Sequence, residues 1–245
     1  MIRAFAIPIA LVLAVLAVAP RIIAAQFGFL RGSNRNAVTI RADDGRTVTG
    51  FIVEADQRPA AAVVLVPMLG RSKDDWQQTA ERFADANITA LAIDLPGQSA
   101  PAEARDLTAW HTVIGAAVGY LAARSDVRAS AIGVAGASLG ANLAVIAAAS
   151  DSRIRSLALI SPSLDYRGVR IENSFKQYGE RPALLLASRK DPYAARSARE
   201  LSAAGGGVRE MQWAETPAHG TVLLSREPDL IRSLVEWFRR TLAVN

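Results

Sequence analysis

Apolar runs and amphipathic segments alternate along the chain from residue 38 onward. Runs such as 61–67 and 88–94 are almost continuously apolar, which is typical of parallel strands covered on both faces. Other segments carry apolar residues at helical spacing, and in 104–123 these residues form one stripe. The alternation predicts an α/β fold, with a mainly parallel sheet of about eight strands and helices on both of its faces.

The expected elements can be assigned in chain order. Strands 38–42 and 47–55 flank the turn-rich tetrapeptide DDGR, so we expect an antiparallel hairpin there. Further strands are expected at 61–67, 88–94, 131–136, 154–161, 183–188 and 208–214. Helices are expected around 76–84, 104–123, 138–150, 193–204 and 230–238.

Composition narrows the class of protein. The 245 residues are 51% hydrophobic, with no linker, repeat or block of like charges, which favours a single folded domain. The absence of cysteine excludes a disulfide framework, a cysteine nucleophile and thiolate metal sites. The net charge of +5 comes without a basic face interleaved with aromatics, so we predict no nucleic-acid partner.

The first residues predict export. One arginine precedes residues 4–19, which are uncharged and mostly apolar. This run is shorter than the ~20 residues of a spanning helix and has the length of a signal sequence. We predict that 1–25 is a signal peptide, cut after Ala19 or Ala25, and that 26–245 is a periplasmic or secreted domain. The alternative is an uncleaved N-terminal anchor that associates with a membrane.

The stretch VAGASLGAN, residues 134–142, contains glycine-x-serine-x-glycine centred on Ser138. A chain of this length would show the spacing by chance with a probability of roughly 0.1, so its position matters more than its presence. Ser138 falls where a buried strand must turn sharply into a helix, which would lift its side chain above the sheet. Gly136 and Gly140 suit that turn because a side chain at either position would collide where strand and helix pass closely.

In this strand, turn and helix the chain resembles the α/β-hydrolase superfamily, over about residues 38–243. The resemblance implies an α/β-hydrolase fold and the chain order nucleophile, acid, histidine. It also implies serine hydrolysis of carboxylic esters through an acyl-enzyme, with Ser138 as the nucleophile and no metal or organic cofactor. The compact dienelactone-hydrolase branch is similar in build, but it generally uses a cysteine nucleophile, which this chain lacks.

Only two histidines can serve as the base. His111 belongs to the 104–123 helix, well before Ser138, where a helix-flank role is the better interpretation. His219 follows the last strand, in a turn where the family typically carries its catalytic histidine; an ordinary turn residue is the alternative.

The resemblance places the acid at Asp191, directly after strand 183–188. The same residue is also suited to cap the next helix, ahead of Pro192. Asp165, after the preceding strand, is the rival candidate because some members of the superfamily take their acid from that position.

The segment PMLGRSKDDW, 67–76, resembles the family's oxyanion loop, with Pro67 and Met68 where histidine and glycine are common. The backbone N–H groups of Leu69 and Leu139 are predicted to hold the oxyanion, with Met68 as an alternative donor to Leu69. Pro67 is excluded because it has no N–H. DLPGQS, 94–99, resembles a structural turn of the family and is given no catalytic role.

The cover over the site is expected to be minimal. About twenty residues, 162–181, join the strands between which many members of the family insert a cap, so we expect at most one small helix. Tyr166, Phe175 and Tyr178 in this connection could line an acyl pocket or pack the segment down.

A small or medium ester is the expected substrate. A lysophospholipase, thioesterase or peptidase would share every motif, and the altered oxyanion loop keeps a catalytically silent binding or envelope-scaffold protein as a further alternative.

Overall fold

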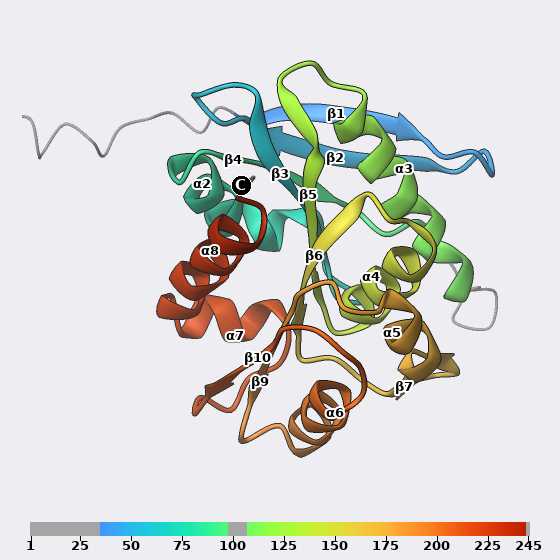
Figure 1. Ribbon diagram of the computed structural model, residues 1–245, viewed down its shortest axis with the longest axis vertical. Coiled ribbons are helices and arrows are strands. Elements are labelled where there is room, and N and C mark those ends of the chain that lie inside the picture. Colours follow the sequence, from blue (N-terminus) through green and yellow to red (C-terminus); the bar gives the residue numbers. More distant parts are fainter. Residues whose placement is uncertain (1–34, 98–106, 244–245) are drawn as a thin grey trace, which may run out of the picture. The chain divides into compact units, whose positions relative to one another are not determined.

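Eight strands of the chain form one sheet, in the order β1-β2-β4-β3-β5-β6-β9-β10 (Figure 1). The computed structural model describes residues 35–97 and 107–243. β1 is antiparallel to β2 and β2 to β4, whereas β4, β3, β5, β6, β9 and β10 run parallel to one another. The strands are β1 Arg35–Arg41, β2 Thr47–Val53, β3 Ala60–Val66, β4 Ile88–Ile93, β5 Val127–Ala137, β6 Ile154–Ile160, β9 Ala183–Ser188 and β10 Arg209–Ala214.

Helices cover both faces of this sheet. The side chains of α2, α7 and α8 pack into a core on one face, and those of α3, α4, α5 and α6 pack into a core on the other (Figure 1). β3, β4 and β9 are buried along their whole length between these layers, which explains their continuous apolar runs. The helices are α2 Gln77–Asp85, α3 His111–Ala122, α4 Leu139–Ser150, α5 Glu172–Tyr178, α6 Pro192–Ala203, α7 Thr221–Arg226 and α8 Asp229–Thr241, with 3₁₀ turns η3 Lys73–Trp76 and η5 Thr108–Trp110.

The predicted fold class is therefore confirmed. The hairpin at the front, the six further strands and the five expected helices are all present, with bounds that differ by a few residues. The stripe predicted on the 104–123 helix is buried from Leu107 to Leu121, and the part before residue 107 lies outside the described residues. α7, a six-residue helix that begins two residues after His219, was not expected from the sequence.

The connection between β6 and β9 is short, as predicted, but it holds more structure than one helix. It contains the two-stranded hairpin β7 Asp165–Tyr166 and β8 Val169–Arg170, followed by α5. Asn142 of α4 fixes this segment, because its side chain donates to the Val169 carbonyl at 3.1 Å and accepts from the Ser163 N–H at 3.1 Å. Both contacts are buried, so the connection is held against α4.

The aromatic residues of the same connection pack rather than line a pocket. Phe175 and Tyr178 are almost fully buried, and their rings stack with centroids 6.1 Å apart. The Tyr178 hydroxyl donates to the Pro182 carbonyl at 2.7 Å. Tyr166 remains half-buried at the edge of the core. For Phe175 and Tyr178 the packing alternative is thus the correct one.

The predicted leader, residues 1–25, lies outside the described residues, so export and anchoring both stay predictions. Within 35–97 and 107–243, none of the helices combines the length and apolar character needed to cross a bilayer.

Candidate active site

Ser138 forms the sharp turn between β5 and α4. Its φ of 52° and ψ of −119° lie in a region that residues with side chains rarely adopt. The Ser138 N–H donates to the Ile160 carbonyl at 2.9 Å, and the Ser138 carbonyl accepts from the Ala141 N–H at 2.9 Å. The turn is therefore held by both the neighbouring strand and the following helix, at the carboxyl end of the parallel strands.

The two glycines of the motif allow the strand and the helix to pass at backbone contact. A Cβ added to Gly136 would lie 2.3 Å from the Gly140 carbonyl oxygen, and one added to Gly140 would lie 2.5 Å from that of Pro67. Both distances are shorter than any side chain tolerates, as the sequence analysis predicted. The second contact also places the end of β3, and the loop that follows it, directly beside the first turn of α4.

Gly136→Ala is expected to destabilise the protein by about 1–3 kcal/mol, because the added methyl group meets backbone that cannot swing aside. Gly115→Ala, in α3, is the matched control: a Cβ there meets nothing within 4 Å. The control should gain about 0.5–1 kcal/mol from helix propensity. Urea unfolding midpoints at constant m-value measure both changes. Equal stability of the two variants would contradict this explanation of the motif.

His219 lies against Ser138, 81 residues away along the chain. Its Nε2 is 2.8 Å from the Ser138 Oγ, and its Nδ1 is 2.5 Å from the Asp191 Oδ2. The carboxylate can only accept, so Nδ1 carries the proton and Nε2 is left to accept from the serine hydroxyl. The His219 side chain is 40% exposed, whereas Ser138 is 7% exposed, so the histidine is the more accessible of the two.

The Asp191 carboxylate makes the contacts that suit both roles the sequence left open, a partner of the histidine and a helix cap. Its Oδ2 faces His219, and its Oδ1 accepts from the Ala194 N–H at 3.2 Å as the N-cap of α6. The rival Asp165 is engaged elsewhere. Its carboxylate accepts from the Gly168 N–H and the Arg170 Nε, both at 2.8 Å, and the Arg170 bond lowers the pKa of Asp165. The structure thus brings Asp191, and not Asp165, to the histidine.

Three hydroxyl groups that the sequence analysis did not single out hold the His219 loop, residues 215–220. The Ser161 Oγ accepts from the Gly220 N–H at 3.0 Å, and the Ser188 Oγ donates to the Thr216 carbonyl at 2.6 Å. Thr221 donates to the Asp75 Oδ2 at 2.6 Å. Ser161 and Ser188 end or follow buried strands, which is the one sequence signal that could have identified them.

Of the two residues predicted to donate to the oxyanion, Leu69 lies in the loop after β3 and Leu139 begins α4. The Arg71 N–H donates to the Met68 carbonyl at 3.2 Å and closes a turn that contains Leu69 and Gly70. Met68 also packs against the histidine loop, with its sulfur 2.7 Å from where a Gly220 Cβ would lie. Leu139 is the first residue of α4, where helix N–H groups lack partners within the helix.

The residues that follow this loop are held by Asp94, the first residue of the DLPGQS segment. Asp94 accepts from the Lys73 N–H at 2.9 Å and from the Lys73 Nζ at 2.6 Å. Thr49 of β2 donates to the same carboxylate at 2.9 Å. Ser99 of this segment lies outside the described residues.

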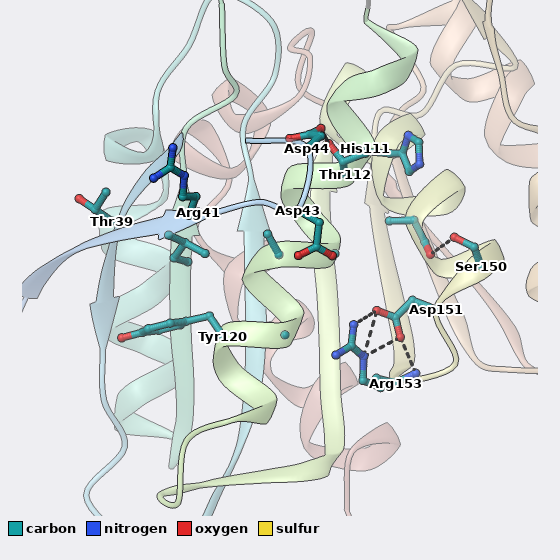
Figure 2. A pocket seen from close by; sticks show the side chains of 15 residues that line it. Thr39, Arg41, Asp43, Asp44, His111, Thr112, Tyr120, Ser150, Asp151 and Arg153 are labelled. Atoms are coloured by element: carbon teal, nitrogen blue, oxygen red, sulfur yellow. Dashed lines mark hydrogen bonds and ion pairs between the residues drawn. The ribbon is translucent and has the colours of Figure 1, made fainter. Parts of the chain in front are cut away.

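His111 occupies a different part of the molecule. Its Nδ1 bonds the Thr108 carbonyl at 2.7 Å, as expected for a helix-flank residue. It lines a surface hollow of about 870 Å³ between β1, α3 and the end of α4, where Asp151 and Arg153 form an ion pair. Figure 2 shows His111 among the side chains that line this hollow. Within the two described ranges, no three His, Asp or Glu side chains gather in a way that would hold a metal ion.

Solved structures with the same architecture are numerous. A dienelactone hydrolase from Anabaena variabilis is 18% identical, with a TM-score of 0.74 over 85% of this chain and 98% of that one. An esterase domain from a Rhodothermus marinus protein is 18% identical, with a TM-score of 0.68 over 85% and 100%. The Pyrococcus furiosus esterase Pf2001 is 14% identical, with a TM-score of 0.68 over 85% and 93%. At these identities the likeness shows the fold alone.

The fold and the strand-to-helix serine turn define the class of the protein as an α/β hydrolase. The sequence pattern of the Alpha/beta hydrolase family matches residues 63–244. The chain belongs to this family. A comparison with curated protein sequences gives no significant match.

Proposed function

We propose that the protein is a serine hydrolase that cleaves small or medium carboxylic esters. The observation that supports this most is the line of contacts from the Ser138 Oγ through both His219 nitrogens to the Asp191 carboxylate. A serine hydroxyl needs such a base to become nucleophilic near neutral pH. The names of the similar structures, esterases and a dienelactone hydrolase, also favour an ester substrate.

The proposed reaction has two steps and uses no metal or organic cofactor. The Ser138 Oγ adds to the ester carbonyl carbon while its proton passes to His219 Nε2, and the backbone N–H groups of Leu139 and Leu69 stabilise the oxyanion. The C–O bond to the alcohol then breaks, and His219 returns the proton to the leaving alkoxide. Water, deprotonated by His219, attacks the acyl-enzyme, and the proton goes back to the Ser138 Oγ as the acid leaves.

A fluorophosphonate probe combined with esters of graded acyl length tests this function. The wild-type protein should be labelled at one residue and should hydrolyse the shorter esters. Ser138→Ala should show neither property. Ser150→Ala is the control, because Ser150 ends α4 far from the turn and bonds only the Ala147 carbonyl in the described structure. A folded wild-type protein that neither reacts with the probe nor hydrolyses any ester would favour the silent binding or scaffold protein instead.

A further inference from the structure

Asp75 lies where the two loops of the proposed site meet. It belongs to η3, and its Oδ2 accepts from the Thr221 Oγ1 at 2.6 Å and from the Arg71 Nε at 2.7 Å. Thr221 is the second residue after His219, and Arg71 is the second residue after Leu69. One carboxylate oxygen therefore joins the loop after β3 to the first residue of α7, directly after the His219 loop, and its contact with Thr221 spans 146 residues of sequence.

The Thr221 end of this junction is shielded from water, whereas the Arg71 side chain at the other end is 49% exposed. The Asp75 side chain is 17% exposed and Thr221 is 3% exposed. A hydrogen bond to a carboxylate is stronger than one between neutral groups, and the low local dielectric strengthens it further. The contact can therefore hold a fixed distance between the loops.

The residues on either side of Asp75 are firmly anchored. Its neighbour Trp76 is fully buried, and Lys73 at the start of η3 is held through its N–H and its ammonium group by Asp94. Within the loop, the Arg71 N–H also closes the turn on the Met68 carbonyl. Because Asp75 is anchored in this way, its contact with Thr221 affects the position of the His219 loop and not that of the sheet beneath it.

We propose that Asp75 is a positioning residue that sets the His219 ring against the Leu69 amide; this inference rests on the proposed function. The Leu69 amide must meet the developing oxyanion while the His219 ring moves the serine proton. These two groups lie in loops that follow different strands, β3 and β10. A displacement of about 1 Å in such an arrangement can cost about 100-fold in rate. Both groups act on the transition state, so their misplacement lowers kcat and leaves KM nearly unchanged.

The test uses pairs of variants of the full chain that differ in one hydrogen bond. Thr221→Val keeps the shape of the side chain and removes the hydroxyl, and Thr221→Ser keeps the hydroxyl. Thr112→Val is the matched control, because Thr112 donates to the Asp44 Oδ2 at 2.7 Å, at the hollow away from the site. Turnover is expressed per active protein, counted by fluorophosphonate labelling carried to completion.

We expect Thr221→Val to lower kcat about 10- to 100-fold with KM within about twofold of wild type. Thr221→Ser should keep most of the activity, and Thr112→Val should be unaffected. Asp75→Ala should resemble Thr221→Val, and the double variant should lose no more than the worse single variant, because both changes break the same contact.

The outcomes separate this inference from the proposed function. Wild-type kcat per labelled protein in Thr221→Val, with a labelled wild type, would overturn the role of Asp75 and leave the hydrolase proposal standing. If Thr221→Val reduces only the number of labelled molecules and leaves kcat per labelled molecule unchanged, Asp75 contributes to stability alone. That result would also overturn the proposed positioning role. A wild-type protein that is not labelled at all would remove the proposed function and this inference together.

Discussion

Ser138→Ala and His219→Ala are each expected to lower kcat for ester hydrolysis by about 10⁶-fold, and the double variant by no more than either. In the proposed mechanism the hydroxyl and the imidazole act as one unit, through the 2.8 Å contact between them. Without the base the hydroxyl stays a weak nucleophile, and without the hydroxyl the base has no proton to accept. Initial rates at saturating ester, with the single and double variants side by side, measure the effect.

The folded state should survive both substitutions. The Ser138 side chain does not cap α4, and its positive φ is supported by backbone bonds that alanine would keep. The His219 side chain is 40% exposed. Circular dichroism and thermal unfolding provide the control. Additive losses in the double variant, or a His219→Ala variant with wild-type kcat, would show that the two side chains do not act together.

The sequence predicted the parts of the fold that carry strong periodic patterns. β3, β4 and β9 are buried along their full length, so their apolar runs were unambiguous. The elements that were missed are short. α7 has six residues, and β7 and β8 have two residues each. Segments of this length cannot build a periodic pattern, and they are fixed by tertiary contacts such as the buried bonds of Asn142.

The candidate site was more predictable than is usual, because the chain has only two histidines. The glycine spacing located Ser138, the order along the chain left His219, and the family resemblance favoured Asp191 over its rival Asp165. The structure places Ser138, His219 and Asp191 in contact. The supports of these residues could not be predicted in the same way. Thr221 and Asp75 are separated by 146 residues, and nothing in either local sequence indicates the other. Only the parallel sheet brings the two loops to one edge.

Asp191→Asn is the second variant for which a very large effect is expected, a loss of about 10⁴-fold in kcat. Asparagine can still accept from the Ala194 N–H, so the cap of α6 and the fold are retained. The atom facing His219 can then become an N–H₂ group that cannot accept from Nδ1. The ring would shift to the tautomer with its proton on Nε2, which cannot take the proton of Ser138. Rates per labelled molecule, corrected for folded content, measure the loss.

Asp165→Asn is the control for the choice of acid. The Asp165 carboxylate pairs with an Arg170 side chain that is 80% exposed, and solvent screening makes such a surface pair a minor contribution to stability. The asparagine oxygen can keep the bond from the Gly168 N–H, and no contact to His219 is lost. We therefore expect wild-type turnover in this variant. The reverse result, with turnover lost in Asp165→Asn and kept in Asp191→Asn, would transfer the acid to the loop after β6, and the contact between Asp191 and His219 would then serve only to hold the loop after β10.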